Sequence, residues 1–598
     1  MTRPLPRAAR WPTALRICAV VALAPALAVA TAPPAGAEPP AAAGPALVPG
    51  FVVQELPSGQ DELLTDFAFL PDGSYVTTGK NGRVAWVSAA GEARTLAELP
   101  VLTRNDLGLV AVAVAPDAGT LYTGRALDVD GQWTLRLSAW TLVGGPQPTA
   151  LADERVVLEL PASSEAHGLT GVVAAPDGTL WVTIGDSSGY VGADPLALRA
   201  LDLSTGYGKL LHVLPDGGGV PDNPFYDPAD PGAWQSRVYA SGFRSPFRLD
   251  LDPVTGAPVV GDVGWTAWEE VDVVRPGAVY GWPCWEGDGP TPGYAELPGC
   301  QGVPNTPPLW AYPHGPQGSS ITGGFVYTGT AYPPEYQGAY FFGDYSAQRV
   351  YTLRHDAAGQ LVRLPEADGF AAELGAPVAF APHPVDGDVV WADIRGSSLA
   401  RLVYAPGNRP PMARATATVD ATTRTVAFDG GASADLDGDP LTHRWDLGDG
   451  AVAEGAQVVH AYEGTGTEPV TATLTVTDPG GGQDTATVTV VPGNSPPQLT
   501  LTAPLTDRRW TPGELVQASA TAVDAEDGPL TVRWSELLVH CSGGLCHEHP
   551  GETFEGPEYA RPFVDHGEGT RMEVAVTATD SVGVTAREVF VLQQQAAV

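Results

Sequence analysis

A short pattern recurs along the chain: a turn rich in Pro, Asp and Gly joins two stretches of alternating apolar and polar residues. Examples are "FLPDGSYVTTGKNGRVAWV" from Phe69, "AAPDGTLWVTIGD" from Ala174 and "YQGAYFFGDYSAQRVYTL" from Tyr336. Alternation with a period of two is typical of β-strands, and such turns suit hairpins. Six of these hairpins occur before Tyr404. Because repeated hairpins over several hundred residues are typical of a β-propeller, we predict a six-bladed propeller over residues 46–405.

Two linkers rich in Pro and Gly divide the rest of the chain. They read "APGNRPPMA" from Ala405 and "PGNSPPQ" from Pro492, and X-Pro bonds favour extended backbone. Strongly alternating segments follow each linker, for example "PVTATLTVTD" and "MEVAVTATDSVGV". We therefore predict two Ig-like β-sandwiches, at residues 408–492 and 496–592, so that the whole chain is all-β.

Composition supports the all-β prediction and excludes some partners. Charged residues make up only 17% of the chain, while 71 Gly and 58 Pro suit short strands joined by turns. The formal net charge of -37 repels nucleic acid and anionic lipid, so we expect no nucleic-acid partner. Lys occurs only at Lys80 and Lys209, so an anionic ligand would be held by Arg, whose guanidinium grips carboxylates bidentately.

The N-terminus has the layout of a secretory signal. Four Arg residues precede an apolar run from Ile17 to Ala30, and the small-residue site Ala35-Gly36-Ala37 follows. We expect a signal peptide over residues 1–37 and a secreted, extracellular protein. Since this run is short for a membrane span and the C-terminus has no long apolar stretch, we expect no span in the mature protein.

The cysteines outside this segment form two locally spaced pairs. We expect disulfides between Cys284 and Cys300 and between Cys541 and Cys546, because conditions outside the cell are oxidising. The string "HCSGGLCHEHP" also leaves a zinc site open. The residues of this string that could bind zinc are Cys541, Cys546, His547 and His549.

One hairpin carries a candidate catalytic pair at its open end. The stretch "SEAHGLTGVVAAPDGTLWVTIGDSSGY" places His167 just before one strand and Asp186 just after the next. Counting outward from the turn puts Asp186 opposite Leu169, with His167 one pleat away. A carboxylate near a His fixes its tautomer and stabilises its charged form, as a general base requires. A loop His and a turn-capping Asp are the alternative interpretation.

Four longer blocks carry a family resemblance. They read "HGLTGVVAAPDGTLWVTIGD", "RALDLSTGYGKLLHVLPDGGGVPDNPF", "YASGFRSPFRLDLDPVTGAPVVGDVGWTAWEEVDVVRPGAVYGWPCWEG", and "SITGGFVYTG" followed by "YQGAYFFGDY". In order and wording they resemble the glucose/sorbosone dehydrogenase family, which includes soluble pyrroloquinoline-quinone (PQQ)-dependent sugar dehydrogenases and hedgehog-interacting-protein-like propellers. The resemblance implies a six-bladed propeller. In the first sandwich "WDLGDG", from Trp445, resembles the polycystic kidney disease (PKD) repeat, which implies an extracellular spacer or carbohydrate-adhesion module.

The resemblance implies roles for individual residues. His167 matches the family's catalytic base, Asp186 the acid that orients it, and Arg244 the Arg that contacts quinone and substrate. Gly264 and Trp265 match the pair whose backbone carbonyls hold Ca²⁺. The implied reaction is oxidation of an aldose sugar at its anomeric carbon to a lactone, with PQQ and Ca²⁺ as cofactors and an external electron acceptor.

The chain departs from the family at the cofactor contacts. Ser245 follows Arg244 where the family commonly has Asn, and the last predicted blade offers Arg395 and Arg401 but no Lys. Arg395 is therefore the candidate contact for a cofactor carboxylate. These departures leave open a non-catalytic propeller that binds carbohydrate, with the C-terminal domains contacting polysaccharide or cell wall. A Ca²⁺-dependent lactonase is a third interpretation, since other six-bladed propellers hydrolyse lactones.

Two further sets of residues have both a ligand-binding and a structural interpretation. The aromatic set in "YGWPCWEG" is Tyr280, Trp282 and Trp285. These rings could stack on a sugar or pack beside the disulfide. The acidic set in "ADLDGDP" is Asp435, Asp437 and Asp439. It resembles a Ca²⁺ loop, which "DAEDG" from Asp524 echoes, whereas turns capped by Asp are the other interpretation.

Overall fold

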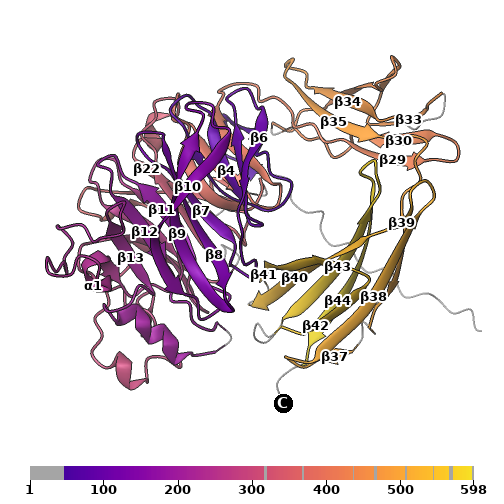
Figure 1. The fold of residues 1–598 in the computed structure, drawn as a ribbon. Coiled ribbons are helices and arrows are strands. Elements are labelled where there is room, and N and C mark those ends of the chain that lie inside the picture. Colours follow the sequence, from indigo (N-terminus) through magenta and orange to yellow (C-terminus); the bar gives the residue numbers. More distant parts are fainter. Residues whose placement is uncertain are drawn as a thin grey trace, which may run out of the picture. The chain divides into compact units, whose positions relative to one another are not determined.

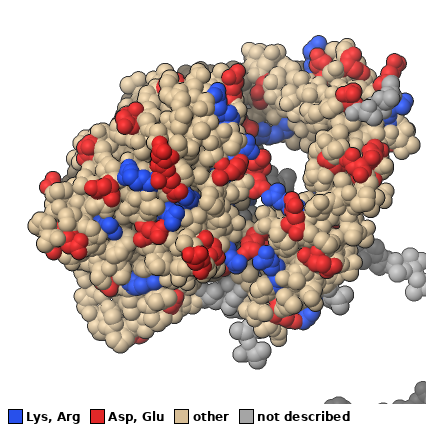
Figure 2. Space-filling model, viewed as in Figure 1, with Lys and Arg blue, Asp and Glu red and all other residues tan. Residues whose placement is uncertain are grey.

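In the computed structural model of the protein nearly all regular secondary structure is β-strand (Figure 1), which confirms the all-β prediction. The residues that it describes are 46–190, 192–315, 320–365, 369–372, 374–435, 437–463, 468–504, 508–542, 545–564 and 570–595, without the side chains of 46 and 540–550. The predicted signal peptide lies outside them. None of the described helices is long and apolar enough to cross a membrane. On the face of the molecule that Figure 2 shows, acidic and basic side chains are interspersed.

Six antiparallel sheets follow one another in the described part of residues 46–404. The first is β3 (Leu64–Phe69), β4 (Tyr75–Gly79), β5 (Arg83–Val87) and β6 (Ala93–Glu98). The second is β7 (Leu109–Val114), β8 (Thr120–Val129), β9 (Gln132–Val143) and β10 (Ala150–Pro161). The third is β11 (Leu169–Ala174), β12 (Leu180–Ile184), β13 (Lys209–Val213) and β14 (Val238–Ser241).

The other three sheets complete the series. The fourth is β15 (Pro246–Leu251), β16 (Pro258–Asp262), β17 (Trp268–Val273) and β20 (Trp310–Pro313). The fifth is β21 (Ile321–Val326), β22 (Ala339–Asp344), β23 (Arg349–His355), β24 (Leu361–Arg363), β25 (Ala371–Ala372) and β1 (Ala46–Leu47). The sixth is β26 (Pro377–Pro382), β27 (Val389–Asp393), β28 (Ser398–Tyr404) and β2 (Phe51–Leu56).

Small elements lie in the connections between these strands. The paired short strands are β18 (Trp285–Glu286) and β19 (Gly289–Pro290). The described helices are η1 (Pro195–Leu201), α1 (Trp234–Arg237), η2 (Pro298–Cys300) and η3 (Pro334–Tyr336).

The six sheets form a closed ring. The strand named first in each sheet contacts the strand named first in the next sheet. The order is β3, β7, β11, β15, β21 and β26, and β26 contacts β3 again. The ring is also closed along the chain, because the N-terminal strand β2 pairs with β28 in the last sheet. Closing the ring leaves only short sheet edges exposed, as propeller-type folds do.

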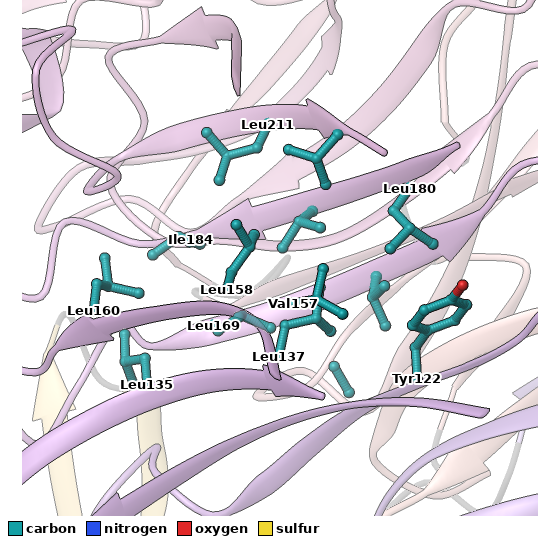
Figure 3. Close-up of a cluster of buried hydrophobic side chains, with 14 of the residues drawn as sticks. Tyr122, Leu135, Leu137, Val157, Leu158, Leu160, Leu169, Leu180, Ile184 and Leu211 are labelled. Atoms are coloured by element: carbon teal, nitrogen blue, oxygen red, sulfur yellow. The ribbon is translucent and has the colours of Figure 1, made fainter. Parts of the chain in front are cut away.

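Apolar residues from neighbouring sheets fill the space between them. Figure 3 shows the core between the second and third sheets, to which Leu137 contributes from β9 and Leu180 from β12. Both side chains are buried, and burial of a Leu contributes about 1.5–3 kcal/mol. The alternation in the sequence thus directs one face of each strand into these layers.

Arg248 on β15 joins four of the six sheets at the centre of the ring. Its guanidinium donates to backbone carbonyl oxygens of the first, third and sixth sheets. These are Thr65 O at 2.7 Å, Thr170 O, and Val378 O at 3.0 Å. The buried Asp66 carboxylate lies 3.9 Å away and is the ionic partner of this buried cation.

The C-terminal part contains two pairs of sheets. Residues 416–490 form one sheet of β29 (Thr416–Asp420), β30 (Thr425–Asp429) and β33 (Gln457–Ala461), and another of β31 (Thr442–Asp446), β32 (Val452–Glu454), β34 (Val470–Thr477) and β35 (Gln483–Val490). Residues 498–594 form the second pair. One sheet of this pair contains β36 (Gln498–Thr502), β38 (Leu515–Asp524), β39 (Gly528–Leu530) and β42 (Glu558–Pro562). The other sheet contains β37 (Arg509–Trp510), β40 (Val532–Ser542), β41 (Leu545–Glu555), β43 (Arg571–Thr579) and β44 (Thr585–Gln594). Each pair encloses its own core around a fully buried Trp, Trp445 or Trp534.

One predicted disulfide is present, and the other lies outside the described side chains. Cys284 and Cys300 are bonded and close a loop beside β18 and β19. Cys541 and Cys546 face each other in the register of β40 and β41, but side chains of 540–550 are not described. The Cys541–Cys546 disulfide and the zinc alternative therefore stay predictions.

Replacement of Arg248 by Met should destabilise the ring. The change removes the donors to three sheets and leaves the buried Asp66 without its cation, which typically costs about 3–5 kcal/mol. Urea unfolding followed by Trp fluorescence checks this, with Arg94→Met at an exposed position as the matched control. Equal unfolding free energies for the two variants would contradict the role given to Arg248.

Candidate functional site

His167 and Asp186 lie opposite each other at the open end of the β11–β12 hairpin. The structure pairs Leu169 with Ile184 rather than with Asp186 as counted from the sequence. The difference arises because the turn is one residue tighter and a β-bulge lies between Leu169 and Gly171. The prediction that Asp186 opposes Leu169 is therefore wrong. The observed register places Asp186 directly opposite His167.

Direct contact joins the pair. The His167 Nδ1 atom lies 2.8 Å from Asp186 Oδ1, and both residues are buried. His167 has φ +55°, a strained conformation for a non-glycine residue, and Gly185 packs against it. A Cβ atom at Gly185 would lie 2.6 Å from the His167 carbonyl oxygen, so only glycine permits this approach.

The Asp186 carboxylate accepts hydrogen bonds from three further donors. Oδ1 also accepts the Ser188 N–H at 3.0 Å. Oδ2 accepts the Ser188 hydroxyl and the Trp282 indole N–H, each at 2.7 Å. With 0% of its surface exposed, Asp186 depends on these donors, because an unpaired buried carboxylate is costly.

These contacts keep Asp186 ionised and set the His167 tautomer. Burial raises the pKa of Asp186, but the charge and hydrogen bond of His167, the Arg244 guanidinium and the Ser188 N–H outweigh it and lower the pKa to about 2. An ionised carboxylate accepts only, so the proton between the two residues belongs to Nδ1. Nε2 of a neutral His167 is then an acceptor that can take a proton.

Arg199 holds the loop that carries Asp186. Its Nη2 donates to the carbonyl oxygens of Asp186 and Ser187, each at 3.0 Å, and its Nη1 donates to the Ser163 hydroxyl at 2.9 Å. Ser187, like His167, has a positive φ, of 51°. Arg199 therefore fixes the backbone on which the carboxylate is mounted.

Arg244 adjoins the pair, as the sequence predicted. The Asp186 N–H donates to the Arg244 carbonyl oxygen at 2.8 Å, and the Arg244 guanidinium lies 5.6 Å from the ring centroid of Trp282. Trp282 thus touches both the carboxylate and the cation. The Arg244 Nε atom is buried and has no hydrogen-bond partner among the described residues, so it is available to an oxygen atom of a ligand.

The other predicted cofactor contacts are arranged differently from the expectation. Arg244 Nη1 donates to the carbonyl oxygens of Val263 and Gly264, at 3.1 and 2.7 Å. Because Arg244 already donates to the Gly264 carbonyl oxygen, a Ca²⁺ ion bound to the same oxygen would lie close to a second cation, which repels it. Among the described residues no group of three or more His, Cys, Asp and Glu could hold a metal ion. The Gly264–Trp265 carbonyl pair does not fit Ca²⁺ in this arrangement.

Three further predicted residues lie at or beyond the edge of the site. Ser245 donates its N–H to Asp262, so it supports the Arg244 loop through its backbone. Trp265 is half-buried and donates its indole N–H to the Tyr190 carbonyl oxygen at 3.0 Å. Arg395 is exposed after β27, with its guanidinium over the Tyr345 ring.

A small acidic pocket adjoins Arg244. It is lined by Gly242, Arg244, Asp262, Gly264, Glu270, Tyr280, Trp282, Trp285 and Glu286. Burial raises the pKa of Asp262 to about 7, although the hydrogen bonds that it accepts from the N–H groups of Arg244 and Ser245 act to lower it. Glu286 Oε1 accepts four successive backbone N–H groups from Trp265 to Trp268, while its buried Oε2 has no partner among the described residues. The surroundings of Arg244 are therefore rich in carboxyl groups on this side, and burial favours the neutral forms of Asp262 and Glu270.

The predicted aromatic platform is largely core. Tyr280 is buried and stacks on Phe243 with centroids 4.8 Å apart, and Trp282 is buried against Tyr294. Neither ring has a free face for a sugar, and only Trp285 is half-buried at the pocket. Trp282 instead belongs to the His167–Asp186 network, a role that its position in the sequence did not reveal.

The acidic set in the first C-terminal domain forms an ion pair and capped turns. Arg409 donates its N–H and its Nε–H to the two oxygens of Asp437, at 2.7 and 2.8 Å. Asp435 Oδ1 accepts the N–H groups of Asp437 and Asp439. A buried Arg already supplies positive charge to Asp437, which favours the interpretation of these residues as turns capped by Asp, and Ca²⁺ at Asp435, Asp437 and Asp439 stays a prediction.

Two family models match the chain. The model described as "Glucose / Sorbosone dehydrogenase" matches residues 62–375, which is more than half of the chain. The model described as "PKD domain" matches residues 408–491.

Individual proteins are similar over part of the chain. An uncharacterized protein of Synechocystis sp. is 27% identical over 264 residues, 42% of this chain and 60% of the relative. An aldose sugar dehydrogenase of Escherichia coli is 27% identical over 230 residues, 36% of this chain and 57% of the relative. The chain thus spans less than two thirds of each.

A solved structure, the PQQ-bound form of an aldose sugar dehydrogenase from Streptomyces coelicolor, is 20% identical with a TM-score of 0.47 and covers 60% of this chain and 99% of that one. The dehydrogenase family match covers the hairpin with His167 and Asp186 and the loop with Arg244. The chain belongs to the glucose/sorbosone dehydrogenase family and carries a PKD domain after its dehydrogenase-like region.

Proposed function

We propose that the protein is a secreted, PQQ-dependent dehydrogenase of aldose sugars. In this proposal the six sheets of residues 46–405 are the blades of a six-bladed propeller, and two Ig-like domains at 408–492 and 496–592 act as spacers or contact polysaccharide. The observation that carries it is the buried His167–Asp186 pair, with the Arg244 backbone hydrogen-bonded to Asp186. The E. coli relative's name, aldose sugar dehydrogenase, supports the substrate class.

His167 acts as the general base. Its Nε2 takes the proton of the anomeric hydroxyl while the C1–H bond breaks, and Asp186 stabilises the imidazolium that forms. The product is the lactone. Trp282, Ser188 and Arg199 keep the carboxylate aligned with Nδ1, so that the imidazole needs no reorientation when it gains charge.

Arg244 would hold the cofactor. PQQ, when bound, supplies the acceptor for the hydride that leaves C1, and an external acceptor later removes the electrons. The unpartnered Nε of Arg244 fits an anionic quinone oxygen or carboxylate beside the Trp282 ring. No role is assigned to Ca²⁺ at Gly264, because Arg244 occupies that carbonyl.

A second candidate, carbohydrate binding without catalysis, is favoured by the charge around Arg244. Asp262, Glu270 and Glu286 line the adjoining pocket, and their ionised forms repel a polyanionic cofactor such as PQQ, although burial raises the pKa of Asp262 and Glu270 and so weakens this repulsion. A neutral sugar would not meet this repulsion. Cofactor binding therefore separates the two candidates.

Reconstitution tests the proposal. The full chain with added PQQ should reduce a redox dye in the presence of an aldose, and His167→Gln should lower the rate by about 10²–10⁴-fold, as expected for loss of a general base. Quenching of Trp fluorescence measures PQQ binding, which the variant should retain. His460→Gln, in the PKD domain, is the matched control and should keep full activity.

Two outcomes would contradict this scheme. Equal dye reduction by the wild type and His167→Gln would remove His167 from the reaction. Absence of PQQ binding in the wild type, together with retained sugar binding by calorimetry, would establish the carbohydrate-binding candidate instead.

The depressed pKa of Asp186 predicts a pH-dependent stability. The folded value of about 2 lies below the ordinary 3.8, so the contribution is complete above about pH 4 and is lost as the pH falls toward 2. The difference in unfolding free energy between wild type and Asp186→Asn should shrink by about 2 kcal/mol over this range. Urea titrations at several pH values measure it, and a pH-independent difference would refute the assignment.

A further inference from the structure

Lys209, the first residue of β13, is a fully buried cation. None of its surface is exposed, and its ammonium group donates to three backbone carbonyl oxygens. These belong to Arg199 at 2.9 Å, Ala200 at 2.8 Å and Tyr207 at 2.6 Å. An ammonium group has three N–H donors, so the three acceptors satisfy it completely. Such a complete set of partners for a costly buried charge indicates that the ammonium group holds these carbonyls in place.

Two of the three carbonyls lie in the last turn of η1. The last carbonyls of a helix have no partner within it, and a cation is favourable beside them. The same short helix carries the Arg199 guanidinium, which donates to the carbonyl oxygens of Asp186 and Ser187. Lys209 therefore fixes the backbone of the residue that fixes the Asp186 loop.

The third carbonyl belongs to the residue on which the Arg199 side chain rests. The Arg199 guanidinium lies over the Tyr207 ring, 4.0 Å from its centroid. The Tyr207 hydroxyl donates to the Pro161 carbonyl oxygen at 2.6 Å, which fixes the other end of this ring. Lys209 thus binds the backbone of both members of a cation–π pair, so that Arg199 is held at its main chain and at its side chain.

The Arg244 side of the site meets the same lysine. The Ala200 carbonyl oxygen that Lys209 binds also accepts the Gly242 N–H at 2.9 Å. Gly208 donates its N–H to the Gly185 carbonyl oxygen at 3.0 Å and accepts the Gly242 N–H at 3.2 Å. A Cβ atom at Gly208 would lie 2.4 Å from Ala200 Cβ, so only glycine permits this approach. Three segments therefore converge here: η1, the end of the β11–β12 hairpin and the loop before β15.

Burial sets the charge state of Lys209. It lowers the pKa of this side chain to about 7, while Asp202 acts to raise the pKa and Arg199 to lower it. The ammonium form and the neutral amine are then both populated near neutral pH. A neutral amine has only two N–H donors, so its formation leaves one of the three carbonyls without a donor from Lys209.

We propose that Lys209, in its ammonium form, is a positioning residue for the reaction. Through Arg199 it keeps the Asp186 carboxylate aligned with His167, although it touches neither sugar nor cofactor itself. The inference rests on the proposed function, because it assigns a role in that reaction. The alignment itself belongs to the free protein, and it is weakened when the ammonium group is removed or loses its proton.

Proton NMR of the full chain without cofactor or sugar tests this alignment. The His167 Nδ1 proton should exchange with water about tenfold faster in Lys209→Met than in the wild type, the order expected for loss of a hydrogen bond from a charged group. The signal is assigned from His167→Gln. Lys80→Met is the matched control, because Lys80 is the other lysine of the chain and is also buried, and it should keep the wild-type exchange rate.

The PQQ-loaded wild type gives a second test that needs no substitution of Lys209. Carbon-13 labelling of lysine at Cε gives two signals, because the chain has only two lysines, and Lys80→Met assigns them. The value of kcat should fall as the pH rises through the midpoint of the Lys209 signal, since the ammonium form is then lost. In Lys209→Met kcat should be about tenfold lower without this alkaline fall. KM for the aldose should not change, because Lys209 does not contact the substrate.

Two results would overturn the proposal. One is an equal exchange rate of the His167 Nδ1 proton in Lys209→Met and the wild type. The other is a wild-type kcat that stays constant through the Lys209 titration, which decides the question if circular dichroism shows that Lys209→Met does not fold. Absence of dehydrogenase activity in the wild type would contradict the proposed function instead, and the exchange rate would still decide whether Lys209 orders the pair.

Discussion

The site depends on one buried carboxylate. Asp186 is fully enclosed, and it stays ionised because donors from separate parts of the chain converge on it: His167 before β11, Ser188 after β12 and Trp282 after β17. Each donor compensates part of the desolvation cost, and each is thereby held in place. The same interaction that stabilises the loops therefore orients the imidazole.

The ring of sheets gives this carboxylate its surroundings. The third and fourth sheets meet where the Asp186 N–H reaches the Arg244 carbonyl, so the proposed base and the Arg proposed to hold the cofactor share a rigid connection. Arg248, four residues along on β15, joins the fourth sheet to three others. The loop that carries Arg244 thus leads directly into the strand that carries Arg248, and the two Arg residues make different contacts.

Local patterns predicted much of this architecture. Period-two alternation and Pro-Asp-Gly turns identified the strands, because those signals lie within a few residues of each other. The same locality brought His167 and Asp186 together, although a bulge shifted the register. Contacts between distant segments left no such signal. Trp282 lies 96 positions from the carboxylate it contacts, Arg244 binds a carbonyl expected to hold Ca²⁺, and Arg409 pairs with an aspartate 28 positions away.

The central claim is that Asp186 fixes His167 as the Nδ1–H tautomer, with Nε2 free to accept a proton. Nitrogen-15 NMR of protein labelled at histidine measures this directly near neutral pH, with the His167 signals assigned from the His167→Gln variant. The account predicts a protonated Nδ1 and an unprotonated Nε2 for His167. A spectrum with the proton on Nε2 and a bare Nδ1 would contradict it.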